Sequence, residues 1–367
     1  MRHAARLKFY VLAQVLGGLG VALLIVSAVV TLVSFVEVSR ALGNAIDLDF
    51  LQVVGLAWLK TPEVVLQLLP FVFLFGTMGA FIRMNRRAEL VAMRAAGLSA
   101  WGFVLPAVAL ALGIGIGVVL WVGPQATALS GQFETRRAQM LSGGHASAAD
   151  EVWLRQGDDR QQIVIHARHR NAAGGAVRLT GVSLFIQSVE ADGDLVFSRR
   201  IEAASANLIP GAWRLVDVLE ALPGAQSVHS EQLSLPTTLD SRMATATFAT
   251  RSTTSIWDLN TSIRIAEQAG YSATALRLHR QQLLATPAMF AAMALLAAAF
   301  SLRLVRLGNL SIVACGGVLI GFVLFLLNQF CSVLGATEVV SPTLAAWTPP
   351  LLVLLSGASA LCYTEDG

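Results

Sequence analysis

Six long apolar runs divide the chain, three before a polar stretch at about 123–280 and three after it. None contains Asp, Glu, Lys or Arg, and a helix of about 20 such residues crosses the hydrocarbon core of a bilayer. The runs also lack the polar stripe of a helix in a soluble protein, so we predict six membrane spans. They are Phe9–Val36, Val64–Ile82, Trp101–Val122, Leu283–Leu302, Leu307–Leu334 and Leu344–Tyr363.

The polar stretch between the runs has the alternation of β-strands. In 177–188, Val182, Leu184 and Ile186 alternate with other residues, and turn signals such as Asp192-Gly193 separate the segments. Short strands at this spacing indicate a sandwich or jelly roll. Further strand segments are 162–167, 195–197, 212–219 and 232–235, and helical segments are expected at 126–140 and 255–269.

These patterns together predict a membrane α-helical fold with six transmembrane helices and an inserted all-β domain. We expect the first three spans in 1–122, the β domain with its flanking helical segments in 123–280, and the last three spans in 281–367. Composition agrees, because only 13% of the residues are charged, against about 25% in an ordinary soluble domain.

Basic residues in the short loops predict the orientation in the membrane. The short loops on the far side contain only two basic residues, Arg40 and Lys60. Because loops rich in Lys and Arg stay in the cytoplasm, we expect both termini there and the β domain on the other side of the membrane. The basic residues on the cytoplasmic side are Arg2, Arg6, Lys8, Arg83, Arg86, Arg87, Arg94, Arg303 and Arg306.

Several kinds of chemistry find no support in the sequence. A net charge of +3 without a basic stripe argues against nucleic-acid binding. Neither of the two lysines follows a glycine, which excludes a P-loop, and the histidines and three cysteines lack metal-ligand spacing. We therefore predict no catalytic residue, no metal site and no cofactor of the chain's own.

The loop between the second and third runs is the most specific local feature. It contains Leu90, Val91 and Met93 in a short amphipathic stretch that ends at Gly97, with Glu89 near its start. Such a helix could dock in a groove of a partner protein. An ordinary interfacial helix in a basic cytoplasmic loop is the competing interpretation.

The segment Asn85–Ser99 closely resembles the coupling helix of the YjgP/YjgQ permeases, the LptF/LptG membrane subunits of the lipopolysaccharide exporter. The resemblance extends over the chain, and the exit Ala299–Arg303 from the fourth run is more similar to the LptG branch than to the LptF branch. Other matching segments are Val122–Gln125, Arg137–Gln139, Ser255–Asp258 and Val340–Trp347.

The resemblance implies a transport subunit of an ABC exporter in the bacterial inner membrane, with a periplasmic β-jelly roll. A separate LptB-like ATPase dimer would bind ATP and contact the coupling helix at about 85–98, with Glu89 as the coupling acid. An LptF-like permease, LptC and LptA would be the other partners. Arg86, Arg87 and Arg94 flank Glu89, and topology alone explains these arginines equally well.

Lipopolysaccharide carries anionic phosphates and several acyl chains, so it needs basic side chains and an apolar cavity. Arg40, Arg136 and Arg137 follow spans on the outer side, although interface anchoring explains them equally. Ser34 aligns with a lysine of the family, which is a departure at a lipid-contacting position. Two competing hypotheses about function are a permease for another lipid or for lipoproteins, and a receptor-like membrane protein that transports nothing.

Overall fold

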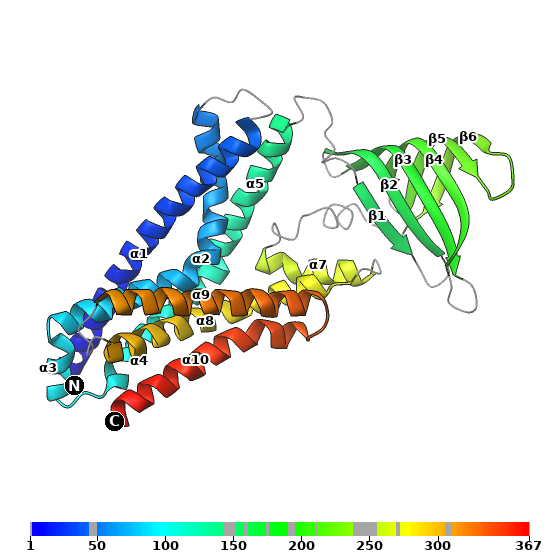
Figure 1. Ribbon diagram of the computed structural model, residues 1–367. Helices are drawn as coiled ribbons and strands as arrows, with labels where there is room; N and C mark the ends of the chain where they lie inside the picture. The colour runs from blue at the N-terminus through cyan, green and yellow to red at the C-terminus, as the bar shows by residue number, and fades with distance from the viewer. Residues whose placement is uncertain are drawn as a thin grey trace. The chain divides into compact units, whose positions relative to one another are not determined.

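A computed structural model describes most of the chain and divides it into two compact units. Residues 1–133 and 274–367 form a helical unit, and residues 134–273 form a second unit that contains the β-sheet. Figure 1 shows the elements along the chain. The described residues are 2–43, 50–141, 152–157, 161–173, 176–189, 195–209, 211–237, 255–268, 272–304 and 310–366.

Six helical segments are long and apolar enough to cross a membrane, which confirms the predicted spans. They extend beyond the apolar runs, because the chain remains helical where polar residues begin. The third span is continuous through a π-helical turn, η1, at Val118–Val122. The long helices are α1 (Arg2–Gly43), α2 (Phe50–Arg86), α4 (Ala100–Gly117), α5 (Gly123–Leu141), α8 (Thr274–Leu304), α9 (Leu310–Ala336) and α10 (Pro342–Asp366).

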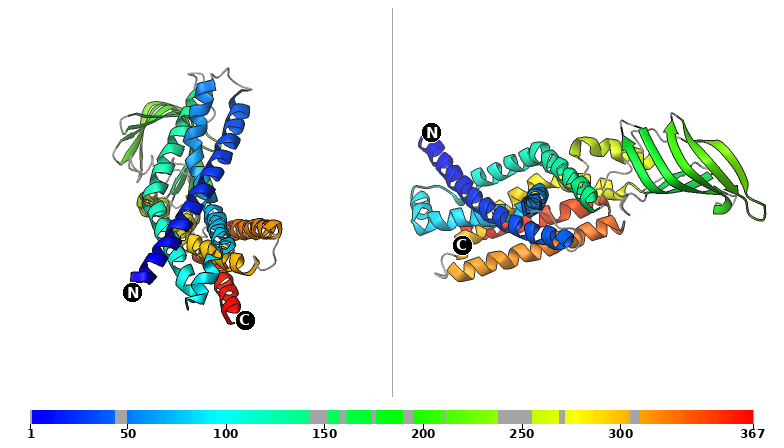
Figure 2. Two further views of the ribbon diagram at one scale, coloured as in Figure 1. Left: turned by 90° about the vertical axis from the view of Figure 1, so that its left-hand side faces the viewer. Right: turned by 90° about the horizontal axis from the view of Figure 1, so that it is seen from above.

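Helix α8 forms the middle of the helical unit and packs against α2, α4, α9 and α10. Every residue from 289 to 299 is buried, which is the pattern of a helix that is apolar on all sides. Small side chains permit this close packing: a Cβ added at Gly115 of α4 would lie 2.6 Å from the Cα of Pro287. Figure 2 shows α8, α9 and α10 side by side.

Helix α1 crosses α2 at a pair of glycines. A Cβ added at Gly18 would lie 2.4 Å from the carbonyl oxygen of Gly76, and one added at Gly76 would lie 2.8 Å from the Cα of Leu19. Beyond this crossing α1 exposes many large apolar side chains, including Leu24 and Leu32. Glycine is therefore what lets the two backbones approach each other.

Six antiparallel strands in the second unit pair in the order of the sequence, β1-β2-β3-β4-β5-β6. The all-β insertion is confirmed. A jelly roll also pairs strands out of sequence order, so that topology stays a prediction. Residues 238–254 lie outside the described part of the chain. The strands are β1 (Val152–Gly157), β2 (Gln161–Ala173), β3 (Ala176–Val189), β4 (Leu195–Ile209), β5 (Ala212–Ala221) and β6 (Val228–Pro236).

One face of the sheet is apolar and buried, with Ile165, Leu184, Ile201, Trp213 and Leu215 at 0 to 1% exposure. These side chains form a single cluster contributed by β2, β3, β4 and β5. The alternation of apolar residues in the sequence therefore corresponds to the side chains on this face.

The predicted helix after the strands is α7 (Ile256–Gln268), where the Ser255 carbonyl accepts a hydrogen bond from the Asp258 backbone N–H at 3.0 Å.

The inward alternation shifts by one residue at the same row of three neighbouring strands. On β3 the buried residues are Leu179 and then Val182, three positions apart, and Gly181 between them has a φ of +62°. On β5 Asp217, with a φ of +58°, lies in the same row. At this row each of these strands has two residues instead of one between successive buried side chains, and the neighbouring strands stay in register, so the apolar side chains remain on one face.

We expect the substitution Gly18→Ala to destabilise the helical unit by about 1–3 kcal/mol, because the new methyl group would force α1 away from Gly76. The measurement is the thermal unfolding midpoint of the detergent-solubilised protein. Gly17→Ala is the matched control, since a Cβ there would meet no atom within 4 Å. Equal effects of the two substitutions would refute the glycine crossing.

Candidate functional site

A sharp elbow joins α2 to the short helix α3 (Glu89–Ala95). Its central residue is Ala88, whose φ of +57° lies in the left-handed region that disfavours residues with a Cβ. Gly97, with a φ of +83°, follows α3, and the Ser99 hydroxyl accepts a hydrogen bond from the Gly102 N–H at 3.3 Å at the start of α4. The helix predicted over 85–98 is therefore shorter, because Ala88 interrupts it.

Helix α3 has one buried side and one exposed side. Leu90 and Met93 pack into the core of the helical unit, with 2% and 6% exposure. The outer side presents Val91, which is 60% exposed, together with the exposed residues Ala92 and Ala95. A short helix with a small apolar outer face can enter a groove on another protein.

Glu89 is held by contacts from two directions. The Tyr10 hydroxyl of α1 donates a hydrogen bond to the Glu89 Oε2 at 3.0 Å, and the Gln14 amide donates to the Tyr10 oxygen at 3.1 Å. The Arg87 guanidinium lies 3.9 Å from the Glu89 Oε1. The sequence prediction missed Tyr10 and Gln14, whose only signal was their spacing of four residues inside an apolar run.

The three arginines predicted beside Glu89 have different environments. Arg86 and Arg87 are both exposed. Arg87 contacts Glu89, and Arg86 is the last residue of α2. Arg94 is half-buried in the last turn of α3. Among the described ion pairs, Glu89 is therefore joined to Arg87 at the elbow.

An apolar cavity of about 760 Å³ lies between α1, α2 and the third span. The π-helical turn η1 contributes Val118 and Val122 to its wall, and a few hydroxyls, such as those of Ser27 and Thr31, interrupt the apolar lining. A cavity of this size and lining can accept hydrocarbon chains. Its other apolar walls include Leu16, Leu23, Trp58, Val65, Phe73 and Ile114.

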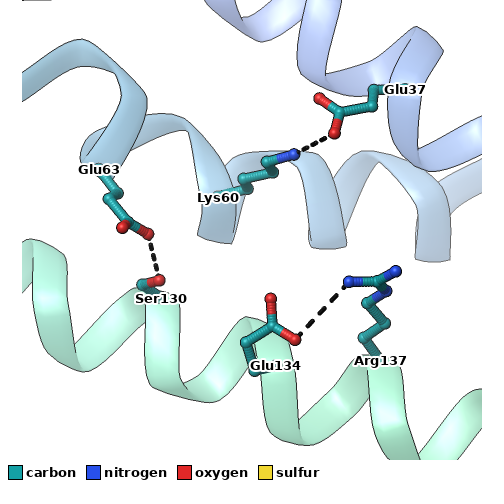
Figure 3. Close-up of polar contacts among 6 residues, drawn as sticks. All are labelled: Glu37, Lys60, Glu63, Ser130, Glu134 and Arg137. Carbon is teal, nitrogen blue, oxygen red and sulfur yellow. Dashed lines mark hydrogen bonds and ion pairs between the residues drawn. The ribbon is translucent and has the colours of Figure 1, made fainter. Parts of the chain in front are cut away.

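Polar contacts join the helices next to this cavity (Figure 3). The Lys60 ammonium of α2 lies 2.6 Å from the Glu37 carboxylate of α1, and 5.9 Å from the ring centre of Phe133. The Ser130 hydroxyl of α5 donates a hydrogen bond to Glu63.

The prediction that Lys60 lies in a loop is wrong, because α2 begins ten residues earlier, at Phe50.

The predicted lipid-contacting residues do not all have the expected environment. Arg40 is exposed in the last turn of α1, whereas Ser34 is buried, with 2% exposure. On α5 Arg136 is exposed, and the Arg137 guanidinium lies 3.7 Å from the Glu134 carboxylate (Figure 3). Their role in lipid binding stays a prediction.

Within the described ranges no three His, Cys, Asp or Glu side chains are placed to hold a metal ion. Cys331 and Cys362 are free thiols in α9 and α10. The expectation that the chain has no metal, cofactor or catalytic residue stays a prediction.

Six spanning helices that flank an inserted antiparallel sheet define a multi-pass membrane protein with a β domain between its two helical halves. The chain belongs to the lipopolysaccharide export system permease LptF/LptG family, whose model matches residues 9–362. Among curated proteins, none matches the chain significantly. The family is a transport component of a membrane complex for lipopolysaccharide export, and its model covers both the LptF and the LptG branch.

The elbow at Ala88 predicts opposite effects for one substitution at two nearby sites. Ala88→Gly should relieve about 1 kcal/mol of left-handed strain, whereas Ala92→Gly should cost about 1 kcal/mol in the helix. Hydrogen exchange of amides 89–96 measures this: protection should rise in the first variant and fall in the second. A fall in both would contradict the strained elbow.

Proposed function

We propose that the chain is the LptG-branch permease of an ATP-driven exporter, which extracts lipopolysaccharide from the bacterial inner membrane. It would pass the lipid to a periplasmic bridge of β-jelly-roll domains. The observation that carries the proposal is the pairing, within one helical unit, of the exposed helix α3 with an apolar cavity of about 760 Å³. The family match supports the same substrate.

The energy for extraction would enter at α3. The sequence contains no P-loop, so a separate LptB-like ATPase dimer would bind and hydrolyse ATP. Val91 protrudes from a small apolar face that the neighbouring alanines form, and the Glu89 carboxylate lies beside this face. A groove with one basic side chain on the ATPase would match this chemistry.

The cavity would receive the acyl chains of the lipid. Each CH₂ group moved out of water contributes about 0.8 kcal/mol, but a chain that leaves the bilayer gains little, because the bilayer is equally apolar. Extraction therefore needs work from outside the cavity. Arg40 on α1, and Arg136 and Arg137 on α5, would contact the phosphates on the periplasmic side.

The apolar face of the sheet would take the acyl chains after extraction. Trp213 and Leu215 in its centre are fully buried, and the Trp213 indole N–H has no described hydrogen-bond partner. The β domain would then transfer the lipid to LptC and to the LptA bridge. With the β domain in the periplasm, both termini would lie in the cytoplasm.

An LptF-like permease would complete the membrane complex. Helix α9 exposes Phe322, Phe325 and Phe330, which is an apolar surface for a neighbouring helix or for lipid. An LptG-branch subunit should assemble with an LptF protein and not with a second LptG. Assembly with LptG alone would instead assign the chain to the LptF branch.

Changes on α3 should separate the permease from its ATPase. We expect Glu89→Lys and Val91→Asp each to reduce co-purification of the ATPase at least about tenfold, because each places a charge at the docking face. The exposed residue Val228 of β6 provides the control, Val228→Asp. Retention of the ATPase and of ATP-driven lipid release in both α3 variants would refute the proposed coupling.

Filling the cavity should block lipid uptake. Gly20 lines the cavity, and a Cβ there would meet no atom within 4 Å, so Gly20→Phe fills space without a backbone clash. We expect less co-purified lipopolysaccharide by native mass spectrometry and slower ATP-driven release. Gly17→Phe on the same helix is the control, since Gly17 is exposed and is not part of the lining. Equal lipopolysaccharide occupancy in the two variants, or phospholipid alone in the unsubstituted protein, would contradict this substrate site.

A further inference from the structure

Helix α1 and helix α3 are joined by a hydrogen bond that spans 79 positions of the sequence. The Tyr10 hydroxyl lies 3.0 Å from the Glu89 Oε2 in a partly buried setting, and the Glu89 side chain is 24% exposed. On either side of this contact, Val11 of α1 and Leu90 of α3 are buried in one core. The bond therefore joins two helices that are each anchored by packing.

Gln14 fixes the direction of this hydrogen bond. Its side-chain amide, one turn along α1, donates to the Tyr10 oxygen at 3.1 Å. Because that oxygen accepts from Gln14, its own proton is directed to the carboxylate of Glu89. A hydrogen bond to an ionised acceptor is among the stronger ones in proteins. Gln14, Tyr10 and Glu89 thus form a directed chain from α1 to α3.

The same helix α1 forms a wall of the apolar cavity, which extends from Leu16, just before the glycine crossing, to Thr31 well beyond it. Tyr10 lies eight residues before Gly18, and the cavity-lining Thr31 lies thirteen residues after it. At 1.5 Å per residue these distances along α1 are about 12 Å and about 20 Å. A rotation of a rigid α1 about the crossing would therefore move Thr31 about 1.6 times as far as Tyr10.

We propose that Tyr10 is a positioning residue that ties α1 to Glu89, so that a displacement of α3 turns α1 about the Gly18–Gly76 crossing and changes the width of the cavity. This inference rests on the proposed docking of an ATPase at α3. It adds the route by which movement at α3 reaches the lipid. Glu89 would then make two contacts: one with the ATPase outside the membrane, and one with Tyr10 within the permease.

Tyr10→Phe tests the proposal, because it removes the hydroxyl and keeps the ring. The exporter complex would be reconstituted in proteoliposomes with lipopolysaccharide, and ATP hydrolysis and lipid release would be measured together. We expect ATPase association to stay unchanged and the thermal unfolding midpoint to fall only slightly, because one hydrogen bond is lost and the ring packing is kept. Lipid released per ATP hydrolysed should fall about tenfold, the order expected for one lost hydrogen bond to a charged acceptor.

Two further variants distinguish positioning from a local structural role. The exchange Phe9→Tyr with Tyr10→Phe moves the hydroxyl to a neighbouring exposed position and should not restore release. Tyr10→Phe combined with Glu89→Ala should release no less lipid than Glu89→Ala alone, because Tyr10 acts through Glu89. Full additivity of the two substitutions would overturn the positioning role.

The outcomes also separate this inference from the proposed function. If Glu89→Ala impairs release and Tyr10→Phe behaves as the unsubstituted protein, the role of Tyr10 is overturned and the docking site at α3 stands. If Glu89→Ala leaves both ATPase association and release intact, the docking proposal fails and the inference fails with it. Gln14→Leu, which leaves Tyr10 in place but no longer orients its hydroxyl, should give a smaller loss in the same direction.

Discussion

Close approach of helix backbones around α8 is the constraint on which the helical unit depends. In a bilayer the lipid tails are as apolar as the side chains, so burial alone does not hold helices together. Packing of small residues takes its place: Gly115 meets Pro287, and a Cβ added at Gly357 of α10 would lie 3.1 Å from the backbone nitrogen of Leu296. The run of buried alanines on α8 serves the same close contact.

Helix α1 is attached differently from α8. It packs mainly on α2, exposes much of its apolar surface, and is held by polar contacts at both ends. Tyr10 joins it to Glu89 on α3, and Glu37 joins it to Lys60 on α2. Between these contacts it approaches α2 closely at Gly18. Helix α8, in contrast, is buried at every residue from 289 to 299, so its position is fixed by packing on all sides.

The sequence was sufficient for the six spans and for the β insertion, because charge-free runs and strict alternation are local signals. It did not reveal that Lys60 is part of α2, since a helix can continue past the membrane boundary without a change in pattern. The break at Ala88 carried no glycine to mark it. Strand β1 was also missed, because its alternation covers only Val152–Gly157.

The candidate site was predicted only in part for a related reason. Glu89 and its flanking arginines could be found in one loop, but Tyr10 lies 79 positions away and only the fold brings it to Glu89. Glu37, Glu63 and Ser130 likewise meet their partners through helix packing. Contacts between distant segments leave no trace in a single sequence, whereas spans and strands do.

The shifted row in the sheet has a consequence for how its strands can pair. Gly181 on β3 and Asp217 on β5 lie in one row, with Ala204 of β4 between them. If one strand slid by a residue, its inward-facing apolar side chains would turn to the other face of the sheet and its irregular position would leave this row. The row therefore favours one register of the strands over the registers displaced by a single residue.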